Sequence, residues 1–388
     1  MNLETANIPD FETKKLSLPD APFLSYQPDF SKIKNAWKEF GGFKNILIIG
    51  HGGSVSSFAG MYRSLGTFNS EKNVIILSTT DPEYIAEIKK KFFKHETLVL
   101  AISKSGENIT QLEAALQFID YSLLVIAGKD STLEKIGKKA GAKIIEHPAI
   151  GGRYTAFTEV ALIPAAICGI DVEQMYSGAK QMHELYSKDN LALQAAQIFY
   201  ALEQKGFVDV FLPIYSHYLF DFGMLIVQLC HESFGKAGTG QTYLAAEAPE
   251  SQHHTNQRFF GGRKNIAGFF VNVENFRNDQ VTIVPPGMQD IAIKDGHLAV
   301  LNKLPLSFSM QSEFRGTFED AKISGIPVAA LHLNLIEPRE IGAFIAFWQM
   351  FAVYSSVLRN VNPFDQPQVE NSKLISWNNR KKWRETYS

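Results

Sequence analysis

Short apolar runs alternate with longer mixed segments between residues 45 and 149, and this alternation constrains the fold more than any other feature. The runs are continuous, as strands buried on both faces of a sheet require: NILIIG, NVIILS, TLVLAIS, SLLVIAG and AKIIEHP. The segments between them carry apolar residues at helical spacing: SSFAGMYRSLG, DPEYIAEIKKKFF, ITQLEAALQFI and TLEKIGKKAG. Strands and helices in this order predict an α/β fold with a mainly parallel sheet, right-handed crossovers and helices on both faces.

A second set of apolar runs follows a helical stretch near residues 157–204: FVDVFLPI, NIAGFFVNV, VTIVPP and PVAALHLN. Separated by helix-like pieces, these runs predict a second α/β unit in tandem with the first. The expected parts are a wrapping segment at 1–40, domains at 41–190 and 191–360, and a C-terminal segment at 361–388.

The 388 residues, 45% of them apolar, are enough to build a large core. The 38 basic and 40 acidic residues nearly balance, so no net field favours nucleic acid or an anionic membrane, and an anionic ligand needs a local site. Two cysteines, Cys168 and Cys230, supply neither a disulfide framework nor a structural metal site. Because the polar, acidic start MNLETANIPDFETKK does not resemble a signal peptide, the expected compartment is the cytoplasm.

The stretch IGAFIAFWQMFAVYSSVL at 341–358 has no formal charge and is long enough for a membrane span. Gln349 and the paired serines inside it, with Glu337 and Arg339 just upstream, fit a buried helix of a large domain better. No membrane partner is therefore expected.

Two loops that follow strands have the composition of an anion site. The first, GHGGSVSSFAG, is a glycine-rich turn before a helix, where backbone N–H groups and the helix dipole favour negative charge. Val55 stands three residues after Gly52, so the dinucleotide fingerprint is absent, and no Gly-Lys-Ser/Thr of a nucleotide P-loop occurs. A tight connection between strand and helix is the simpler alternative.

The second loop, SKSGENIT, places Ser103, Lys104 and Ser105 at the carboxyl end of the third strand, just before a helix. In open α/β sheets, ligands bind at this edge, near the point where the strand order reverses. With Ser54 of the first loop, these residues are expected to hold one phosphate between them. The alternative is that the serines only cap the helix.

Two charged residues stand beside apolar segments. Arg153 lies between glycines and an apolar run in GGRYTAFTEVALIP, so we expect it to meet a carboxylate or a ligand anion, or else to form an interdomain salt bridge. Glu232 ends the apolar stretch GMLIVQLCHE, and on a helix Gln228 lies one turn before it on the same face. A carboxylate at the edge of a core segment suits a general base, although a lone Glu near a helix end is more often solvated.

The segment EAPESQHHTNQRFFGG contains two adjacent histidines, His253 and His254. Adjacent side chains diverge in direction, whereas metal-ligand pairs on a helix prefer four-residue spacing, so one acid–base histidine is the more economical interpretation and no metal is expected. The polar segment NPFDQPQVENSK near the C-terminus has a solvated tail as its default interpretation.

Taken in order along the chain, these segments resemble the phosphoglucose isomerase family, which is built from two sugar isomerase (SIS) domains. The resemblance rests on GGS at 52–54, SKSG at 103–106, GGRY at 151–154, Q…ES.GK at 228–236, QH…Q at 252–257 and FDQ..VE..K at 364–373. It implies two tandem three-layer αβα domains. It also implies a cofactor-free enzyme that interconverts glucose 6-phosphate and fructose 6-phosphate through an enediolate, in glycolysis and gluconeogenesis.

The resemblance implies four catalytic residues. Glu232 corresponds to the base that moves a proton between C1 and C2 of the sugar, and Arg153 to the arginine that stabilises the enediolate. His253 corresponds to the ring-opening histidine and Lys373 to the lysine that assists at the ring oxygen. In the family the histidine comes from the neighbouring subunit, which implies a homodimer with shared active sites.

The resemblance also implies the residues that bind the substrate. Gln228 and Gln366 correspond to polar groups that line the site. The sugar phosphate would be held by Gly53, Ser54, Ser103, Lys104, Ser105 and Asn108. Glu107 and Asn108 stand where the phosphate loop usually carries threonines, and Gln368 replaces a usual glycine before Lys373. A carboxylate at 107 repels phosphate unless it points away, whereas Asn108 can still donate hydrogen bonds.

Two alternative functions stay open at this point. SIS domains also serve as binding modules, so a sugar-phosphate sensor would carry the same loops. An isomerase that also accepts mannose 6-phosphate would differ only in the side chains that read the orientation of one hydroxyl.

Overall fold

In the computed structural model, residues 1–67 and 71–387 are described, and the chain forms two compact units. Unit 1 comprises Met1–Ser17, Gln174–Val227 and Thr239–Arg359, and unit 2 comprises Leu18–Glu173, Gln228–Gly238 and Asn360–Ser388. The units alternate along the chain, whereas the expected domains are consecutive blocks. The division at 40, 190 and 360 stays a prediction, and residues 68–70 and 388 within it lie outside the described residues.

Unit 2 contains a five-stranded parallel sheet in the order β3-β2-β4-β5-β6. Its strands are β2 (Asn45–Ile49), β3 (Asn73–Leu77), β4 (Thr97–Ser103), β5 (Ser122–Ala127) and β6 (Lys143–Glu146). All five were predicted from the continuous apolar runs. Every residue of β2 and β4 is buried, as a strand covered on both faces requires.

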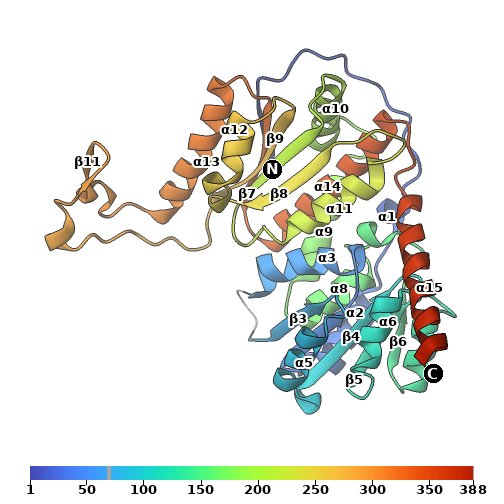
Figure 1. The fold of residues 1–388 in the computed structure, drawn as a ribbon. Helices are drawn as coiled ribbons and strands as arrows, with labels where there is room; N and C mark the ends of the chain where they lie inside the picture. The colour runs from blue at the N-terminus through green and yellow to red at the C-terminus, as the bar shows by residue number, and fades with distance from the viewer. Residues whose placement is uncertain (68–70, 388) are drawn as a thin grey trace. The chain divides into compact units, whose positions relative to one another are not determined.

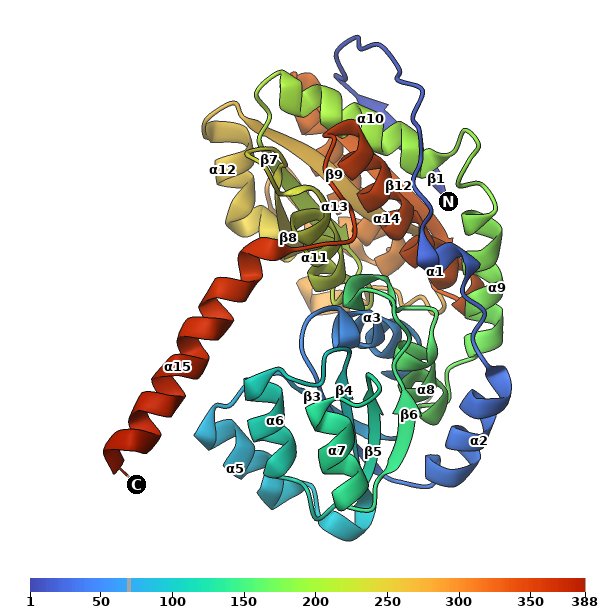
Figure 2. The same cartoon turned by 90° about the vertical axis from the view of Figure 1, so that its right-hand side faces the viewer.

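Helices alternate with its strands along the chain as predicted, and further helices of unit 2 precede β2 or follow β6 in the sequence (Figure 2). They are α1 (Pro22–Ser25), α2 (Phe30–Phe40), α3 (Gly53–Met61), η1 (Tyr62–Gly66), α5 (Pro82–Lys91), η2 (Lys94–Glu96), α6 (Ile109–Leu116), α7 (Thr132–Lys139), η3 (Gly152–Tyr154), α8 (Glu159–Ile167), η7 (Pro367–Val369) and α15 (Glu370–Tyr387). Helices α5, α6 and α7 bury Ile88, Ala114 and Leu133 against one face of the sheet. Helices α2 and α3 each pack on α8.

Unit 1 contains a second five-stranded sheet in the order β1-β12-β9-β7-β8 (Figure 1). Its strands are β1 (Asn2–Ala6), β7 (Asp209–Tyr215), β8 (Thr242–Glu247), β9 (Ile266–Asn275) and β12 (Val328–Leu335). All pairings are parallel except that of β1 with β12. In each unit the first parallel strand along the chain lies between the second and the third, so the two sheets share the order of their first four parallel strands and differ in the fifth strand.

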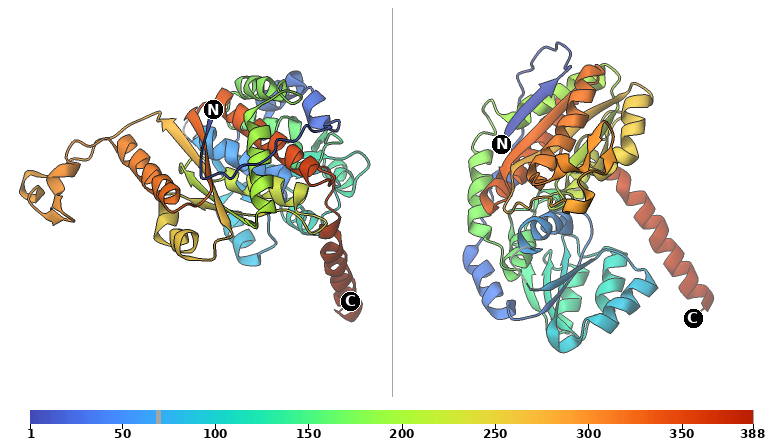
Figure 3. Two further views of the ribbon diagram at one scale, coloured as in Figure 1. Left: turned by 90° about the horizontal axis from the view of Figure 1, so that it is seen from above. Right: turned by 90° about the vertical axis from the view of Figure 1, so that its left-hand side faces the viewer.

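The prediction of one strand in the second sheet is wrong. The run VTIVPP at 281–286 forms no strand and takes part only in an isolated bridge between Val281 and Pro305. Two prolines remove backbone donors there, and Ile283 is 67% exposed. The run belongs to an excursion that carries the small hairpin of β10 (Ala292–Ile293) and β11 (Gly296–His297) away from the sheet of unit 1 (Figure 3).

The remaining helices belong wholly or partly to unit 1. They are α9 (Val172–His183), α10 (Leu191–Gln204), α11 (Phe222–Phe234), η4 (Glu250–His253), α12 (Thr255–Gly261), η5 (Pro286–Met288), η6 (Leu298–Leu301), α13 (Leu306–Ile323) and α14 (Pro338–Leu358). Helices α12 and α13 cover one face of the sheet through an aromatic core, and α10 and α14 pack together. Helix α11 contains Gln228 and Glu232, for which the sequence analysis considered a helix, and its residues from Gln228 onward belong to unit 2.

Helix α14 contains the apolar stretch that matches a membrane span by length. Among the described residues it is the one helix that passes this test, and 89% of its most apolar window is buried inside the protein. Its aromatic rings pack against the sheet of the same unit: Phe269 contacts Trp348 in a tilted arrangement and Phe351 edge-on. Helix α14 is therefore buried as a core helix, which is the interpretation that the sequence analysis preferred.

Candidate active site

A cavity of about 1980 Å³ lies at the carboxyl edge of the unit 2 sheet, and all the residues that line it belong to that unit. It is bordered by the loops that follow β2 and β4, the neighbouring strands between which the chain order of the sheet reverses. The expected site residues on its wall are Gly53, Ser54, Ser103, Lys104, Ser105, Asn108, Arg153, Gln228, Glu232, Gln366 and Lys373. The structure thus brings together every expected site residue except His253.

The loop after β2 approaches another backbone very closely. Gly52, with a positive φ of 55°, precedes the first residue of α3. A Cβ atom added at Gly53 would lie 2.1 Å from the backbone nitrogen of Arg153, so no side chain fits at this position. The glycine pair is therefore needed to seat the GGRY segment against the start of α3.

The loop after β4 is closed by its own side chains. Ser103 Oγ accepts a hydrogen bond from the backbone of Gly106 at 3.1 Å, and Asn108 Oδ1 caps α6 by accepting from the backbone of Gln111 at 3.2 Å. Lys104 and Ser105 are exposed, and so is Glu107, the carboxylate that departs from the family pattern. Both α3 and α6 begin at the cavity wall, where their dipoles favour an anion.

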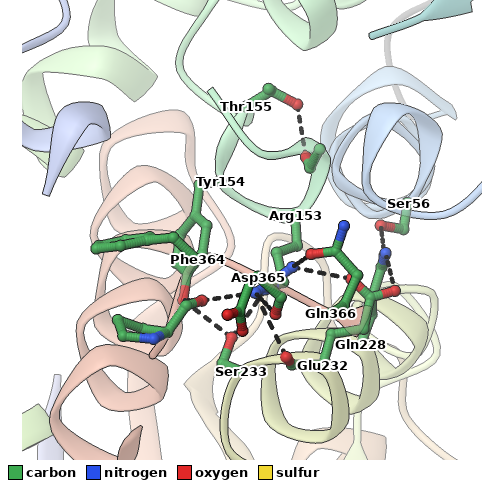
Figure 4. Close-up of polar contacts among 12 residues, drawn as sticks. Ser56, Arg153, Tyr154, Thr155, Gln228, Glu232, Ser233, Phe364, Asp365 and Gln366 are labelled. Atoms are coloured by element: carbon green, nitrogen blue, oxygen red, sulfur yellow. Dashed lines mark hydrogen bonds and ion pairs between the residues drawn. The ribbon is translucent and has the colours of Figure 1, made fainter. Parts of the chain in front are cut away.

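Arg153 is the centre of the polar network at the other border of the cavity (Figure 4). Its side chain is 2% exposed, and each of the three guanidinium nitrogens donates hydrogen bonds. The acceptors are Ser233 Oγ at 2.9 Å, Glu232 Oε2 at 3.0 Å, Gln366 Oε1 at 2.9 Å and the backbone oxygens of Pro363 at 2.5 Å, Asp365 at 3.2 Å and Glu232 at 3.4 Å. The predicted carboxylate partner of the buried Arg153 is therefore Glu232, which belongs to the same unit and is partly exposed.

Glu232 is held at both carboxylate oxygens. Gln228, one helical turn earlier on α11, donates to Oε1 at 2.9 Å, and Arg153 donates to Oε2. Gln228 is itself fixed, because Ser56 donates to its Oε1 at 3.3 Å. The Glu232 side chain keeps 28% exposure, so the carboxylate is oriented by the protein and still open to a ligand in the cavity.

The segment after β12 and α14 contributes more than the sequence suggested. A solvated tail was the default prediction for residues 362–366, but backbone oxygens of this segment accept hydrogen bonds from the side chains of Lys236 and Arg153. Lys236 is bonded to the backbone oxygens of Asn362 and Asp365 and forms an ion pair with the Asp365 carboxylate at 2.5 Å. This hydrogen bond from Lys236 lowers the pKa of Asp365. The loop so anchored presents Pro363 and Gln366 to Arg153.

Sequence reasoning missed several residues of the site. Ser233 and Tyr154 lie within quoted motifs, but no role was assigned to them; the Tyr154 hydroxyl and Ser233 Oγ are 2.9 Å apart, and burial raises the pKa of Tyr154. His51 and Thr110 line the cavity as well. A hydroxyl next to a motif Glu and a histidine inside a glycine-rich turn are the signals by which they could have been found.

Two expected catalytic residues stand apart from the Arg153 network. Lys373 lies in the second turn of α15, borders the cavity and pairs with Glu370 at 2.8 Å. His253 ends η4 in unit 1 and is exposed. Over residues 1–67 and 71–387, no three His, Cys, Asp or Glu side chains gather as ligands for a metal ion.

Comparison with known proteins identifies the family of this chain. The family model described as phosphoglucose isomerase matches residues 30–264. The chain is 31% identical to a probable glucose-6-phosphate isomerase of Methanococcus maripaludis, over 86% of this chain and 78% of the relative. It is 26% identical to a glucose-6-phosphate isomerase of Methanocaldococcus jannaschii, over 88% and 85% of the two chains.

Solved structures show the same fold. A hypothetical protein from Thermus thermophilus superimposes with a TM-score of 0.82 at 24% identity, over 90% of this chain and 86% of the other. A glucose-6-phosphate isomerase from Chlamydia trachomatis superimposes with a TM-score of 0.75 at 19% identity, over 92% and 72% of the two chains. The two sheets are thus a tandem of SIS-type αβα domains. Since the family model covers more than half of the sequence, this chain belongs to the phosphoglucose isomerase family.

Proposed function

We propose that the chain is an aldose–ketose isomerase that interconverts D-glucose 6-phosphate and D-fructose 6-phosphate through an enediolate intermediate. One observation carries the proposal. The buried Arg153 and the partly exposed Glu232 are hydrogen-bonded to each other at the wall of a cavity that two anion-type loops also line. The names of the relatives, glucose-6-phosphate isomerase, support the same reaction.

Glu232 is the proposed base. Removing a proton next to a carbonyl is difficult in water, so the reaction needs a positioned base and a cation where oxyanion charge develops. The carboxylate of Glu232 takes a proton from one of the two carbons and returns it to the other. Arg153 stabilises the negative charge on the enediolate oxygen, and its many acceptors hold the guanidinium in place before the substrate arrives.

The phosphate of the substrate is proposed to bind between the loops after β2 and β4. Its ligands there are the groups around Gly53 and Ser54 on one loop and Ser103, Lys104, Ser105 and Asn108 on the other. Binding of this remote group contributes energy that holds the reacting carbons beside Glu232. Gln228 and Gln366 line the cavity close to the reacting end.

Ring opening is proposed to use His253 and Lys373 as acid and base groups near the ring oxygen, each contributing about 10²- to 10⁴-fold. The neighbouring subunit supplies His253 in this proposal, which makes the active form a homodimer. Apolar side chains exposed on the excursion of unit 1 support it, and a second copy of this chain is the partner that would cover them: Ile283, Met288, Ile291, Ile293 and Val300.

The proposed setting is cytoplasmic glycolysis and gluconeogenesis, with a sugar phosphate as partner and neither nucleic acid nor membrane. The near balance of 38 basic and 40 acidic residues supports the absence of a strongly charged macromolecular partner.

A coupled assay that follows glucose 6-phosphate formed from fructose 6-phosphate tests the function, with and without chelator. Glu232→Gln should lower kcat by about 10²- to 10⁴-fold, because an amide cannot accept the proton. Glu184→Gln, at an exposed glutamate of unit 1, is the matched control and should keep wild-type activity. Equal rates for wild type and Glu232→Gln, or loss of activity with chelator, would contradict the mechanism.

The same assay separates the two alternatives. A sensor binds fructose 6-phosphate without turnover, and an isomerase of broader specificity also converts mannose 6-phosphate. Comparing the turnover of the two aldose phosphates decides between the second alternative and the proposal.

A further inference from the structure

His51 lies in the loop between β2 and α3, is half-buried and lines the cavity of unit 2, yet none of the proposed roles uses it. Its Nε2 atom lies 3.1 Å from the hydroxyl oxygen of Thr110, in the first turn of α6. That hydroxyl lies 2.7 Å from Oδ1 of Asn108. The three side chains therefore form a continuous hydrogen-bonded chain along the cavity wall.

The direction of each hydrogen bond in this chain follows from one backbone group. The backbone N–H of Gln111 can only donate, and it contacts Asn108 Oδ1, so this atom of the amide is the oxygen. Thr110 has one hydroxyl proton and must donate it to that oxygen. Toward His51 the same hydroxyl can then only accept, so Nε2 of His51 carries a hydrogen.

The surroundings of His51 keep the ring neutral. Burial lowers the pKa of His51, and the N-termini of α3 and α6, which begin beside it, disfavour a second positive charge. A neutral ring with hydrogen on Nε2 has a bare lone pair on Nδ1. Among the described residues, no group is hydrogen-bonded to Nδ1.

The lone pair on Nδ1 of His51 determines which ligand groups can bind there. It needs a donor, and a phosphate dianion has no hydrogen to offer above its second pKa of about 6. The next residue, Gly52, packs on Gln228: a Cβ atom there would lie 2.8 Å from Gln228 Nε2, which donates to Glu232. His51 thus lies between the phosphate-type loop of Asn108 and the end of the cavity near Glu232.

We propose that His51 is a further substrate-binding residue whose Nδ1 accepts a hydrogen bond from a hydroxyl of the sugar, and that Thr110 is the positioning residue that fixes its tautomer. The identity of the hydroxyl donor as a sugar phosphate rests on the proposed function. The tautomer of His51 follows from the hydrogen bonds of Thr110 and Asn108 alone.

Three substitutions test the proposal. His51→Gln keeps a group at the place of Nε2 but has none at Nδ1, His51→Asn has the reverse, and Thr110→Val removes the hydroxyl at constant shape. We expect His51→Gln to raise KM and Kd for fructose 6-phosphate by about 3- to 10-fold, the range of one neutral hydrogen bond, with a smaller change in kcat. His51→Asn should recover most of that loss. His95→Gln, at an exposed histidine, is the matched control and should change neither constant.

Two further readouts separate binding from folding. Affinity for inorganic phosphate at pH 8 should stay within about twofold in His51→Gln, because one hydrogen bond to a hydroxyl is lost and none to phosphate. In ¹⁵N spectra, the wild type should show His51 with hydrogen on Nε2, and Thr110→Val should show a mixture of tautomers. Unchanged KM in His51→Gln, or an equal loss of phosphate affinity, would overturn the proposal. If the wild type binds fructose 6-phosphate without turnover, the proposed function fails while the Kd series still tests His51.

Discussion

At the scale of single residues, Arg153 illustrates what the sequence can and cannot reveal. Its neighbours, glycines and an apolar run, predicted a guanidinium directed at a carboxylate or an anion, and Glu232 is that carboxylate. The backbone oxygens of Pro363 and Asp365 were not predictable, because every residue has a carbonyl and no side chain marks the ones that face a cation. The family motif could indicate Gln366, but the loop geometry that brings it to Arg153 depends on Lys236.

His147 links the stability of unit 2 to pH. It is 4% exposed, and its Nδ1 donates to the backbone oxygen of Pro148 at 2.7 Å, which leaves Nε2 buried and without a partner among the described residues. Burial first, and then the charge of Lys104, lower the pKa of His147 to about 4. The unfolded chain takes up this proton near pH 6.5, so the contribution is complete above that pH and is lost as the pH falls toward 4.

We expect His147→Asn, which keeps the donor to Pro148 without titrating, to flatten this dependence. Between pH 6.5 and 4, the free energy of unfolding of the wild type should fall relative to the variant by up to about 1.4 kcal/mol per pH unit. Urea unfolding at a series of pH values measures the difference. His95→Asn serves as the control at an exposed histidine. Parallel curves for wild type and His147→Asn would show that the ring is charged or solvated in the folded state.

At the scale of elements, strands that form continuous apolar runs were easy to predict, and a strand with little buried surface was not. The five strands of unit 2 are uninterrupted apolar runs. Strand β8 was missed, and Tyr243 is the one residue of this strand that is buried. The run at 281–286 shows the opposite error, since apolar residues there are exposed on an excursion. An apolar run in the sequence indicates a strand buried inside a unit, but it does not distinguish such a strand from apolar residues that stay exposed.

Helix α15 is tied to the rest of unit 2 by an ion pair between Arg380 and Glu113. None of its residues is buried, and Arg380 holds it to α6 through two hydrogen bonds of 2.7 Å to the carboxylate of Glu113. This hydrogen bonding lowers the pKa of Glu113. Lys373 lies two turns earlier on the same helix, at the cavity wall, so its placement depends on that tie.

Glu113→Gln should therefore change α15 and leave the protein folded. Both partners are partly exposed, so we expect a loss of global stability below about 1 kcal/mol. Hydrogen exchange of residues 370–387 should accelerate, and kcat should fall if Lys373 assists ring opening. Exchanging the charges, with Glu113→Arg and Arg380→Glu together, should restore slow exchange. Glu87→Gln, which breaks an exposed pair on α5, is the control, and unchanged exchange of α15 in Glu113→Gln would show that other contacts hold the helix.

At the scale of the whole molecule, the site described in unit 2 lacks one proposed catalytic group. Arg153, Glu232 and Lys373 belong to unit 2, whereas His253 is exposed on unit 1. If two chains exchange this histidine in a symmetric dimer, each active site combines Glu232 of one subunit with the histidine at 253 of the other. In such a dimer, Glu232 and His253 of the same chain belong to different active sites, which variants of a single residue cannot reveal.

Two inactive variants should restore activity when they share a dimer. In a mixed dimer of Glu232→Gln and His253→Ala, one site carries both substitutions and the other carries neither. Random assembly makes about half of the dimers mixed, so the refolded mixture should regain about a quarter of wild-type activity. Sedimentation measures the dimer, and the coupled assay measures the recovery. A mixture that stays inactive although mixed dimers form would mean that both residues of each site come from one chain, because every site would then carry one substitution.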